Sequence, residues 1–248
     1  MKRFLKYSVV LLILLSACKQ HLQLTNTQTS HHELKSVLED SLTSATISPY
    51  KNKIDAQMNE VIALCDSTLT KDGYESTLAN FVMLAMDHFV AEKSPNYKGK
   101  SIAMVNRGGL RINLPKGEIS VRTIYELMPF DNNLVILTIS GKALKEALVS
   151  FGENGKLFSN NIEFYLDKKN PINIQVFGKD WNENENYIII TTDYLANGGD
   201  NCFFFENPVK SESTDVKLRD AIIDYCKYLT NLNKRIVPYK NGRITVSK

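Results

Sequence analysis

Strand-type and helix-type hydrophobic patterns are interspersed along this chain without a regular strand–helix–strand alternation. Apolar residues that recur every three or four positions predict helices at 50–60, 75–92, 120–127, 141–151 and 216–230. Short β-branched or apolar runs predict strands at 61–69, 101–105, 133–140, 161–166, 172–176, 187–192 and 243–246. This irregular order favours an α+β fold over a doubly wound parallel sheet.

The N-terminus carries a targeting pattern. Basic residues at positions 2, 3 and 6 precede the apolar run Val9–Leu15, which is too short to span a bilayer as a mature helix. The next residues, L-S-A-C, resemble a bacterial lipobox, in which the cysteine is lipidated; an ordinary secretory signal is the alternative. We therefore predict a lipoprotein signal peptide at 1–17, a lipid anchor on Cys18, a polar tether at 18–46 and a globular domain at 47–248.

The charge balance argues against a nucleic-acid partner. The whole chain has 30 basic and 27 acidic residues, a net charge of +3. Removal of the predicted signal peptide takes away three basic residues and no acidic ones, so the mature chain is neutral. A dedicated nucleic-acid binder concentrates many more Lys and Arg residues.

Few residues in the predicted domain can bind a metal. Cys65, Cys202 and Cys226 are an odd number, so at most one disulfide can form, and their spacing matches no zinc motif. Of the four histidines, only His88 lies in the predicted domain; the other three lie in the predicted tether. We expect no metal site and no cofactor in this chain.

Two loops carry adjacent glycines after an apolar strand. The first is 106–111, N-R-G-G-L-R, and the second is 193–200, D-Y-L-A-N-G-G-D. Glycine pairs permit positive φ and a close approach of the backbone to a ligand. Either loop alone would indicate only a tight turn. The two loops together, with Pro129-Phe130 between them in the sequence, are a more specific indication of a ligand-binding site.

At these residues the chain resembles the C-terminal domain of 5′-nucleotidases, the nucleotide-binding half of UDP-sugar hydrolases and ecto-5′-nucleotidases. The resemblance covers about residues 47–246 and rests on four ordered motifs. Residues 106–111 match N-x-G-G-(I/L)-R, and residues 194–200 match (F/Y)-L-A-x-G-G-D. The third motif runs from I-S at 119–120 to P-F-D-N at 129–132, and the fourth is the strand–helix unit 134–148. The resemblance implies a fold of mixed sheets flanked by helices.

The family's binding roles carry over to five positions. Phe130 and Tyr194 match aromatic residues that sandwich the base, and Tyr194 replaces the commoner Phe while keeping the flat ring. Asn106 matches a residue that hydrogen-bonds the base edge. Arg111 matches an arginine on the ribose and phosphate side, and Asp200 a carboxylate that accepts from the ribose hydroxyls. For Asp200, a turn carboxylate that bonds nearby backbone N–H groups is the alternative.

Two departures from the family pattern matter. The family often places another substrate-binding arginine before the predicted helix 75–92; the sequence there begins with Lys71, which could replace the charge but not the bidentate geometry. Arg107 is a candidate extra contact, with a solvent-facing side chain as the alternative. The sequence also lacks the His and Asp motifs of the family's two-metal phosphatase domain.

We therefore expect no catalytic residue in this chain. The resemblance implies a nucleotide- or nucleoside-binding domain of a 5′-nucleotidase-type hydrolase in nucleotide catabolism. Hydrolysis would require a separate metallophosphatase subunit that holds the divalent metals. The alternative is a non-catalytic lipoprotein that binds nucleosides or nucleotides. Either protein would be lipid-anchored in a bacterial cell envelope, and we expect it to face the periplasm.

Overall fold

The computed structural model describes residues 40–247, apart from the side chains of residues 153 and 154. The predicted signal peptide, Cys18 and most of the predicted tether lie outside the described residues. The chain divides into two units between Ile47 and Ser48, and every described strand belongs to the second unit. Among residues 40–247, no helix combines the length and apolar character that crossing a membrane requires.

The first described helix begins earlier than the sequence pattern predicts. Helix α2 spans Ser41–Met58, whereas the apolar pattern predicted a helix from residue 50. Asp40 explains this start, because its carboxylate accepts hydrogen bonds from Leu42 N (3.1 Å) and from the Thr43 hydroxyl (2.6 Å). A side chain that satisfies free N–H groups in this way caps a helix.

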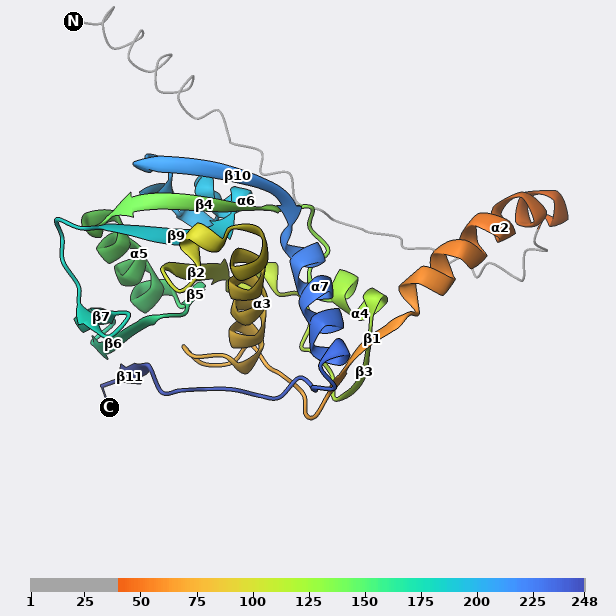
Figure 1. The fold of residues 1–248 in the computed structure, drawn as a ribbon, viewed down its shortest axis with the longest axis horizontal. Helices are drawn as coiled ribbons and strands as arrows, with labels where there is room; N and C mark the ends of the chain where they lie inside the picture. Colours follow the sequence, from red (N-terminus) through yellow and green to blue (C-terminus); the bar gives the residue numbers. More distant parts are fainter. Residues whose placement is uncertain (1–39, 248) are drawn as a thin grey trace, which may run out of the picture. The chain divides into compact units, whose positions relative to one another are not determined.

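A five-stranded mixed sheet forms the centre of the second unit (Figure 1). Its order is β10 (Lys210–Lys217), β4 (Asn133–Ser140), β9 (Asn186–Thr192), β2 (Ser101–Asn106) and β5 (Leu157–Ser159). Strands β2 and β9 pair in parallel, and the other neighbours are antiparallel. The predicted α+β fold with mixed sheets is confirmed.

Two smaller sheets and the helices complete this unit. The second sheet has the order β11 (Ile244–Val246), β6 (Ile162–Asp167), β7 (Asn170–Val176) and β8 (Lys179–Asp180), and β1 (Val61–Cys65) pairs with β3 (Gly117–Ser120). Besides α2, the longer helices are α3 (Thr77–Lys93), α5 (Gly141–Asn154) and α7 (Leu218–Asn231); α4 (Val121–Leu127) and α6 (Asp193–Ala196) are short. Short 3-10 turns lie at 95–97, 107–109, 199–201 and 203–205.

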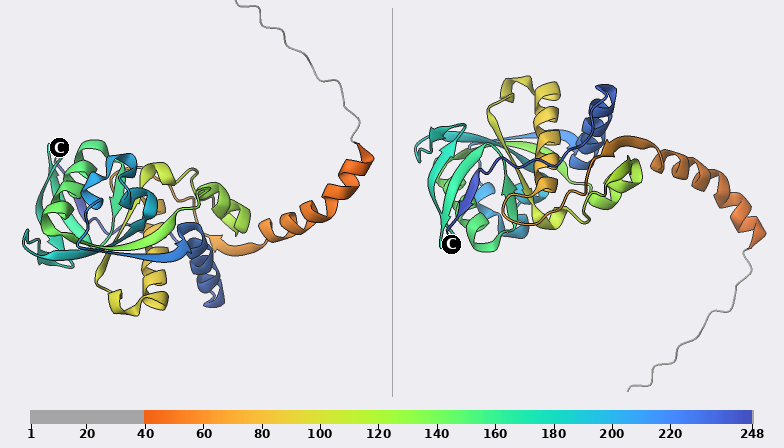
Figure 2. Two further views of the ribbon diagram at one scale, coloured as in Figure 1. Left: turned by 90° about the horizontal axis from the view of Figure 1, so that it is seen from above. Right: turned by 90° about the horizontal axis from the view of Figure 1, so that it is seen from below.

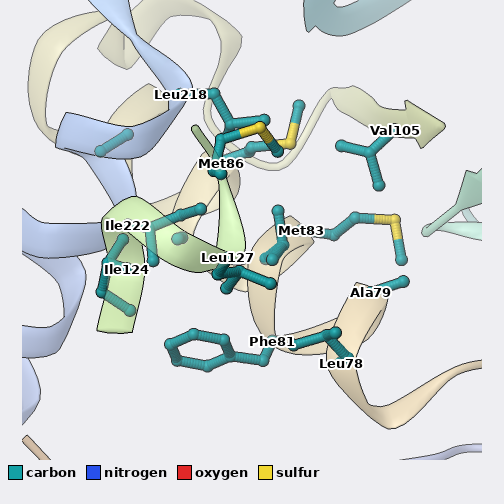
Figure 3. Close-up of a cluster of buried hydrophobic side chains, with 14 of the residues drawn as sticks. Leu78, Ala79, Phe81, Met83, Met86, Val105, Ile124, Leu127, Leu218 and Ile222 are labelled. Atoms are coloured by element: carbon teal, nitrogen blue, oxygen red, sulfur yellow. The ribbon is translucent and has the colours of Figure 1, made fainter. Parts of the chain in front are cut away.

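The central sheet is covered on both faces, which explains why all six residues of β2 are buried. Because side chains alternate along a strand, Ala103 and Val105 join a core with α3, α4 and α7, seen in Figure 3. Ile102 and Met104 join a second core with α5 and the β6–β7 sheet. Figure 2 shows α3 and α5 on opposite sides of the sheet.

Serine side chains fix where three helices begin. Ser76 accepts a hydrogen bond from Ala79 N (3.0 Å) at the start of α3, and Ser140 accepts one from Ala143 N (3.2 Å) at the start of α5. Ser120 and Thr123 form a capping box at the start of α4, which agrees with the helix predicted from residue 120.

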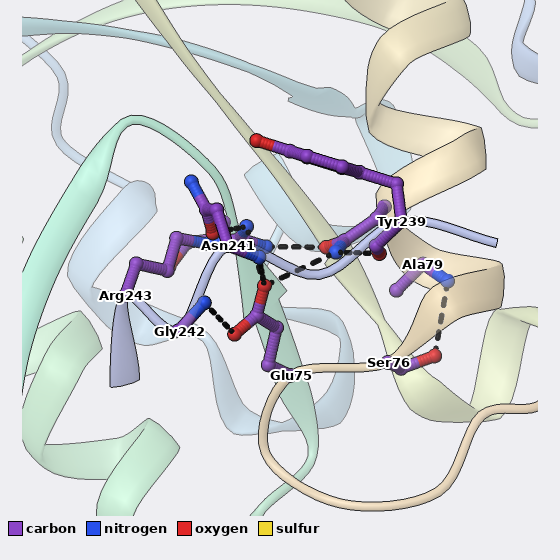
Figure 4. Close-up of polar contacts among 9 residues, drawn as sticks. Glu75, Ser76, Ala79, Tyr239, Asn241, Gly242 and Arg243 are labelled. Atoms are coloured by element: carbon purple, nitrogen blue, oxygen red, sulfur yellow. Dashed lines mark hydrogen bonds and ion pairs between the residues drawn. The ribbon is translucent and has the colours of Figure 1, made fainter. Parts of the chain in front are cut away.

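A buried ion pair joins the C-terminal segment to the start of α3 (Figure 4). Glu75 lies 3.1 Å from Arg243 Nη1, and these two side chains are 8% and 5% exposed. The Glu75 carboxylate also accepts hydrogen bonds from the backbone N–H groups of Asn241 (2.7 Å) and Gly242 (3.0 Å). Asn80 donates to Tyr239 O (2.7 Å) and adds to the same cluster. One carboxylate therefore receives donors from three consecutive residues of the C-terminal segment.

We predict that Glu75→Gln destabilises the protein by about 3–5 kcal/mol, because removal of one partner leaves a buried charge without compensation. In addition, the amide nitrogen of the glutamine side chain is a donor, and it would stand where a carboxylate oxygen now accepts a hydrogen bond. Urea unfolding followed by circular dichroism measures the change. Glu163→Gln, at an exposed position of β6, is the matched control and should cost little. Equal midpoints for both variants would contradict the prediction.

Candidate ligand-binding site

The strand pairing brings three loops to one end of the central sheet. Ala103 of β2 pairs in parallel with Ile190 of β9, so both strands end at the same edge. Strand β4 runs antiparallel to β9, and Leu134 near its start pairs with Thr192 at the end of β9. The residues after β2, after β9 and before β4 therefore converge, although they are far apart in the sequence.

A cavity of about 250 Å³ lies where these loops meet. It is lined by Asn106, Gly108, Gly109, Arg111, Phe130, Asn132, Tyr194 and Asp200. The structure thus brings together the five residues to which the family's binding roles carry over. Asn132 is an additional lining residue; it lies in the P-F-D-N motif, but the sequence analysis gave it no role.

Two aromatic rings of the cavity are exposed instead of packed in the core. Phe130 is 38% exposed and Tyr194 is 44% exposed. The Arg111 guanidinium carbon lies 5.8 Å from the centre of the Phe130 ring, within cation–π range. Arg111 also donates a hydrogen bond to Gly108 O (3.2 Å). The cavity therefore presents two partly exposed aromatic rings beside a positive charge.

A hydrogen-bonded network connects the polar residues of the cavity. Asp200 Oδ2 accepts from Asn106 Nδ2 (2.7 Å), and Asp200 Oδ1 accepts from the Tyr194 hydroxyl (3.0 Å). The Asp200 N–H in turn donates to that hydroxyl (3.2 Å). The Tyr194 phenol is a donor at neutral pH, and its hydrogen bond to Asp200 raises its pKa further. Sequence reasoning missed this contact because it considered only the ring of Tyr194.

Glycines allow the cavity loops to pack closely. A Cβ on Gly109 would lie 2.6 Å from Asn106 Oδ1, and a Cβ on Gly199 would lie 2.6 Å from Tyr194 Cε1. Real Cβ atoms essentially never approach other atoms this closely. Both glycine pairs therefore serve the packing of cavity side chains, as well as the turns themselves.

A buried arginine fixes the loop that carries Phe130. Arg219, at the start of α7, donates to the carbonyl oxygens of Met128 (3.3 Å) and Phe130 (3.2 Å). It also forms an ion pair with Asp131 (2.6 Å), and its guanidinium lies 4.1 Å from the centre of the Tyr125 ring. No motif marked Arg219 in the sequence, because its role depends on a contact across about 90 positions.

Arg107 and Lys71 do not line the cavity. Arg107 donates to carbonyl oxygens of Lys71, Gly73 (2.6 Å) and Gly155 (2.8 Å), and it stacks on Phe158. Lys71 Nζ donates to Leu110 O (3.0 Å). Both cations therefore hold the first glycine loop against the 71–73 segment. The Arg107 side chain has partners within the protein, so the solvent-facing alternative is wrong.

Acidic and thiol groups are dispersed in the described part of the chain. Within residues 40–247, no three His, Cys, Asp or Glu side chains gather closely enough to hold a metal ion. Cys65, Cys202 and Cys226 are free and buried. Burial raises the pKa of the Cys202 and Cys226 thiols to about 12, so both stay protonated at neutral pH.

Comparison with known proteins identifies a family. Residues 56–207 match the family model described as 5′-nucleotidase, C-terminal domain. The trifunctional nucleotide phosphoesterase protein of Bacillus subtilis is 26% identical over 223 residues, which cover 79% of this chain and 14% of that protein. The NAD 5′-nucleotidase of Haemophilus influenzae is 24% identical over 211 residues, which cover 73% of this chain and 35% of that protein.

Solved structures agree on the fold. The 5′-nucleotidase precursor from Thermus thermophilus superposes with a TM-score of 0.67 at 24% identity, over 84% of this chain and 43% of that chain. The chain thus spans less than half the length of each of these three proteins. The resemblance drawn from the sequence motifs is confirmed.

Proposed function

We propose, because the chain belongs to the 5′-nucleotidase C-terminal domain family, that its cavity binds a nucleoside or nucleotide. One observation carries this proposal: five residues predicted from separate motifs line one cavity of about 250 Å³. Exposed rings stack on a base, and the amide and carboxylate offer directional partners to the base edge and the sugar. Arg111 offers a fork of donors to ribose or phosphate oxygens.

We predict that Phe130→Ala and Tyr194→Ala each weaken binding of adenosine and AMP by about 1–3 kcal/mol, since each removes a stacking face. This corresponds to a loss of about 5- to 150-fold in affinity, measured by isothermal titration calorimetry. Phe177→Ala is the matched control, because Phe177 is 41% exposed and lies outside the cavity. Folded Phe130 and Tyr194 variants that bind like the parent would refute the assignment.

We also propose that this domain supplies ligand binding while a metallophosphatase supplies the metals and the chemistry. The relatives named as phosphoesterase and nucleotidase extend well beyond the part that aligns here. The cavity lining offers recognition groups, namely two rings, two amides, a guanidinium and one carboxylate. A non-catalytic protein that captures nucleosides at the envelope is the second candidate, and it uses the same cavity.

We predict that the purified chain releases no phosphate from AMP in the presence of Mg²⁺, Mn²⁺ or Zn²⁺. Addition of a metallophosphatase encoded next to this gene should produce release, because a two-metal site then generates the nucleophile. A phosphate assay of each protein alone and of the mixture measures this. Metal-dependent turnover by the chain alone would contradict the division of labour. No effect of the added phosphatase would favour the non-catalytic candidate.

We propose further that Cys18 anchors the protein to a membrane of the bacterial cell envelope, facing the periplasm. The support is the order of basic residues, apolar run and L-S-A-C in the sequence. Two acyl chains on one residue suffice for stable membrane attachment.

We predict that Cys18→Ala leaves the membrane fraction or remains unprocessed, whereas Gln20→Ala behaves like the parent. Cell fractionation followed by immunoblotting distinguishes these outcomes. Normal maturation and unchanged membrane association of the Cys18 variant would refute lipidation at this residue.

A further inference from the structure

The hydroxyl of Tyr194 has two partners, and both belong to one residue. It donates to Asp200 Oδ1 (3.0 Å) and accepts from the Asp200 N–H (3.2 Å). The ring itself is 44% exposed, so water could satisfy the hydroxyl instead. Stacking on a base uses only the ring face and leaves this pair of hydrogen bonds without a role. The contact therefore requires an explanation beyond stacking.

The loop between the two residues is shaped around the ring. Gly198 has φ +82° and Asp200 has φ +54°, so the chain turns through left-handed conformations on both sides of Gly199. Gly199 packs so closely on the ring that a Cβ there would lie 2.6 Å from Tyr194 Cε1. Left-handed backbone is unfavourable for a residue with a side chain, although Asp tolerates it better than most. The hydrogen bonds to Tyr194 help to hold Asp200 in this conformation.

The Asp200 carboxylate retains free acceptor capacity. Each carboxylate oxygen has about two lone-pair sites. Oδ1 uses one for Tyr194, and Oδ2 uses one for Asn106 Nδ2 (2.7 Å). One site on each oxygen remains, and Asp200 lines the cavity. Two neighbouring acceptors of this kind suit two vicinal hydroxyl donors.

We propose that the Tyr194 hydroxyl is a positioning group that orients the Asp200 carboxylate to accept a vicinal diol, so that preference for a ribose over a dideoxyribose depends on it. This inference rests on the proposed function, because it assumes a nucleoside in the cavity. Tyr194 thus acts twice, through its ring on the base and through its hydroxyl, by way of Asp200, on the sugar.

The test compares adenosine with 2′,3′-dideoxyadenosine in the full-length protein by calorimetry. Tyr194→Phe keeps the ring and removes only the hydroxyl. We expect the affinity loss for adenosine to exceed that for the dideoxy analogue by about fivefold to tenfold, which matches the net contribution of one ordinary hydrogen bond, about 1–1.4 kcal/mol. Tyr228→Phe is the matched control, since Tyr228 is an exposed tyrosine outside the cavity.

A second variant separates positioning from a merely structural role. In an Asp200→Ala background, Tyr194→Phe should produce no further loss of ribose preference, because the hydroxyl acts only through the carboxylate. Thermal unfolding checks that each variant is folded. An additional loss of ribose preference in that background would overturn the inference.

The outcomes distinguish this inference from the proposed function. If the parent prefers adenosine and Tyr194→Phe keeps that preference, or weakens both ligands equally, the inference is wrong and nucleoside binding stands. If the parent binds adenosine without preferring it to the dideoxy analogue, the diol assignment is wrong and nucleoside binding again stands. If the parent binds neither ligand, nor AMP, the proposed function itself fails.

Discussion

The parallel pairing of β2 with β9 is the constraint on which the candidate site depends. The two strands run in the same direction, so their C-terminal ends coincide and both glycine loops start from one edge. The Thr191 hydroxyl donates to Met104 O (2.9 Å) and ties these ends together. Strand β4 runs antiparallel to β9, so the start of β4 lies at this same edge. A register shift by one residue would exchange the two buried faces and separate the loops.

Burial on both faces of the sheet makes this edge a rigid platform for exposed groups. Residues of β2 alternate between two cores, so neither face of the strand can yield without the loss of packing. The cavity rings contribute little to either core and stay exposed. Arg219 holds the Phe130 loop, and Arg107 with Lys71 holds the first glycine loop. The site thus depends on cations that themselves lie outside its lining.

The sequence predicted those parts of the molecule whose cause is local. Apolar runs located β2, β4 and β9, and Ser120 marked the start of α4. Strand β10 was missed, because K-S-E-S-T-D-V-K is an edge strand without apolar alternation, and its pairing with β4 fixes it. The roles of Glu75 and Arg219 were missed for a related reason: their partners lie far away in the sequence, at Arg243 and Asp131. The five cavity residues were found through motifs, although periodicity alone could not place them together.

Affinity and specificity have different sources in such a cavity. In the proposed nucleoside site, stacking on Phe130 and Tyr194 would tolerate different bases, because every base has a π-face. Discrimination requires groups whose hydrogen bonds have fixed directions, and a site with buried polar groups rejects ligands that leave those groups unpaired. Here the directional groups are Asn106 and Asp200, and each restrains the other through the 2.7 Å hydrogen bond. Because Asn106 is 8% exposed and ends a fully buried strand, this restraint passes from the sheet to Asp200 on its strained loop. The rigid strand β2 therefore restrains the carboxylate of an exposed loop, as the proposed selective recognition of a ligand requires.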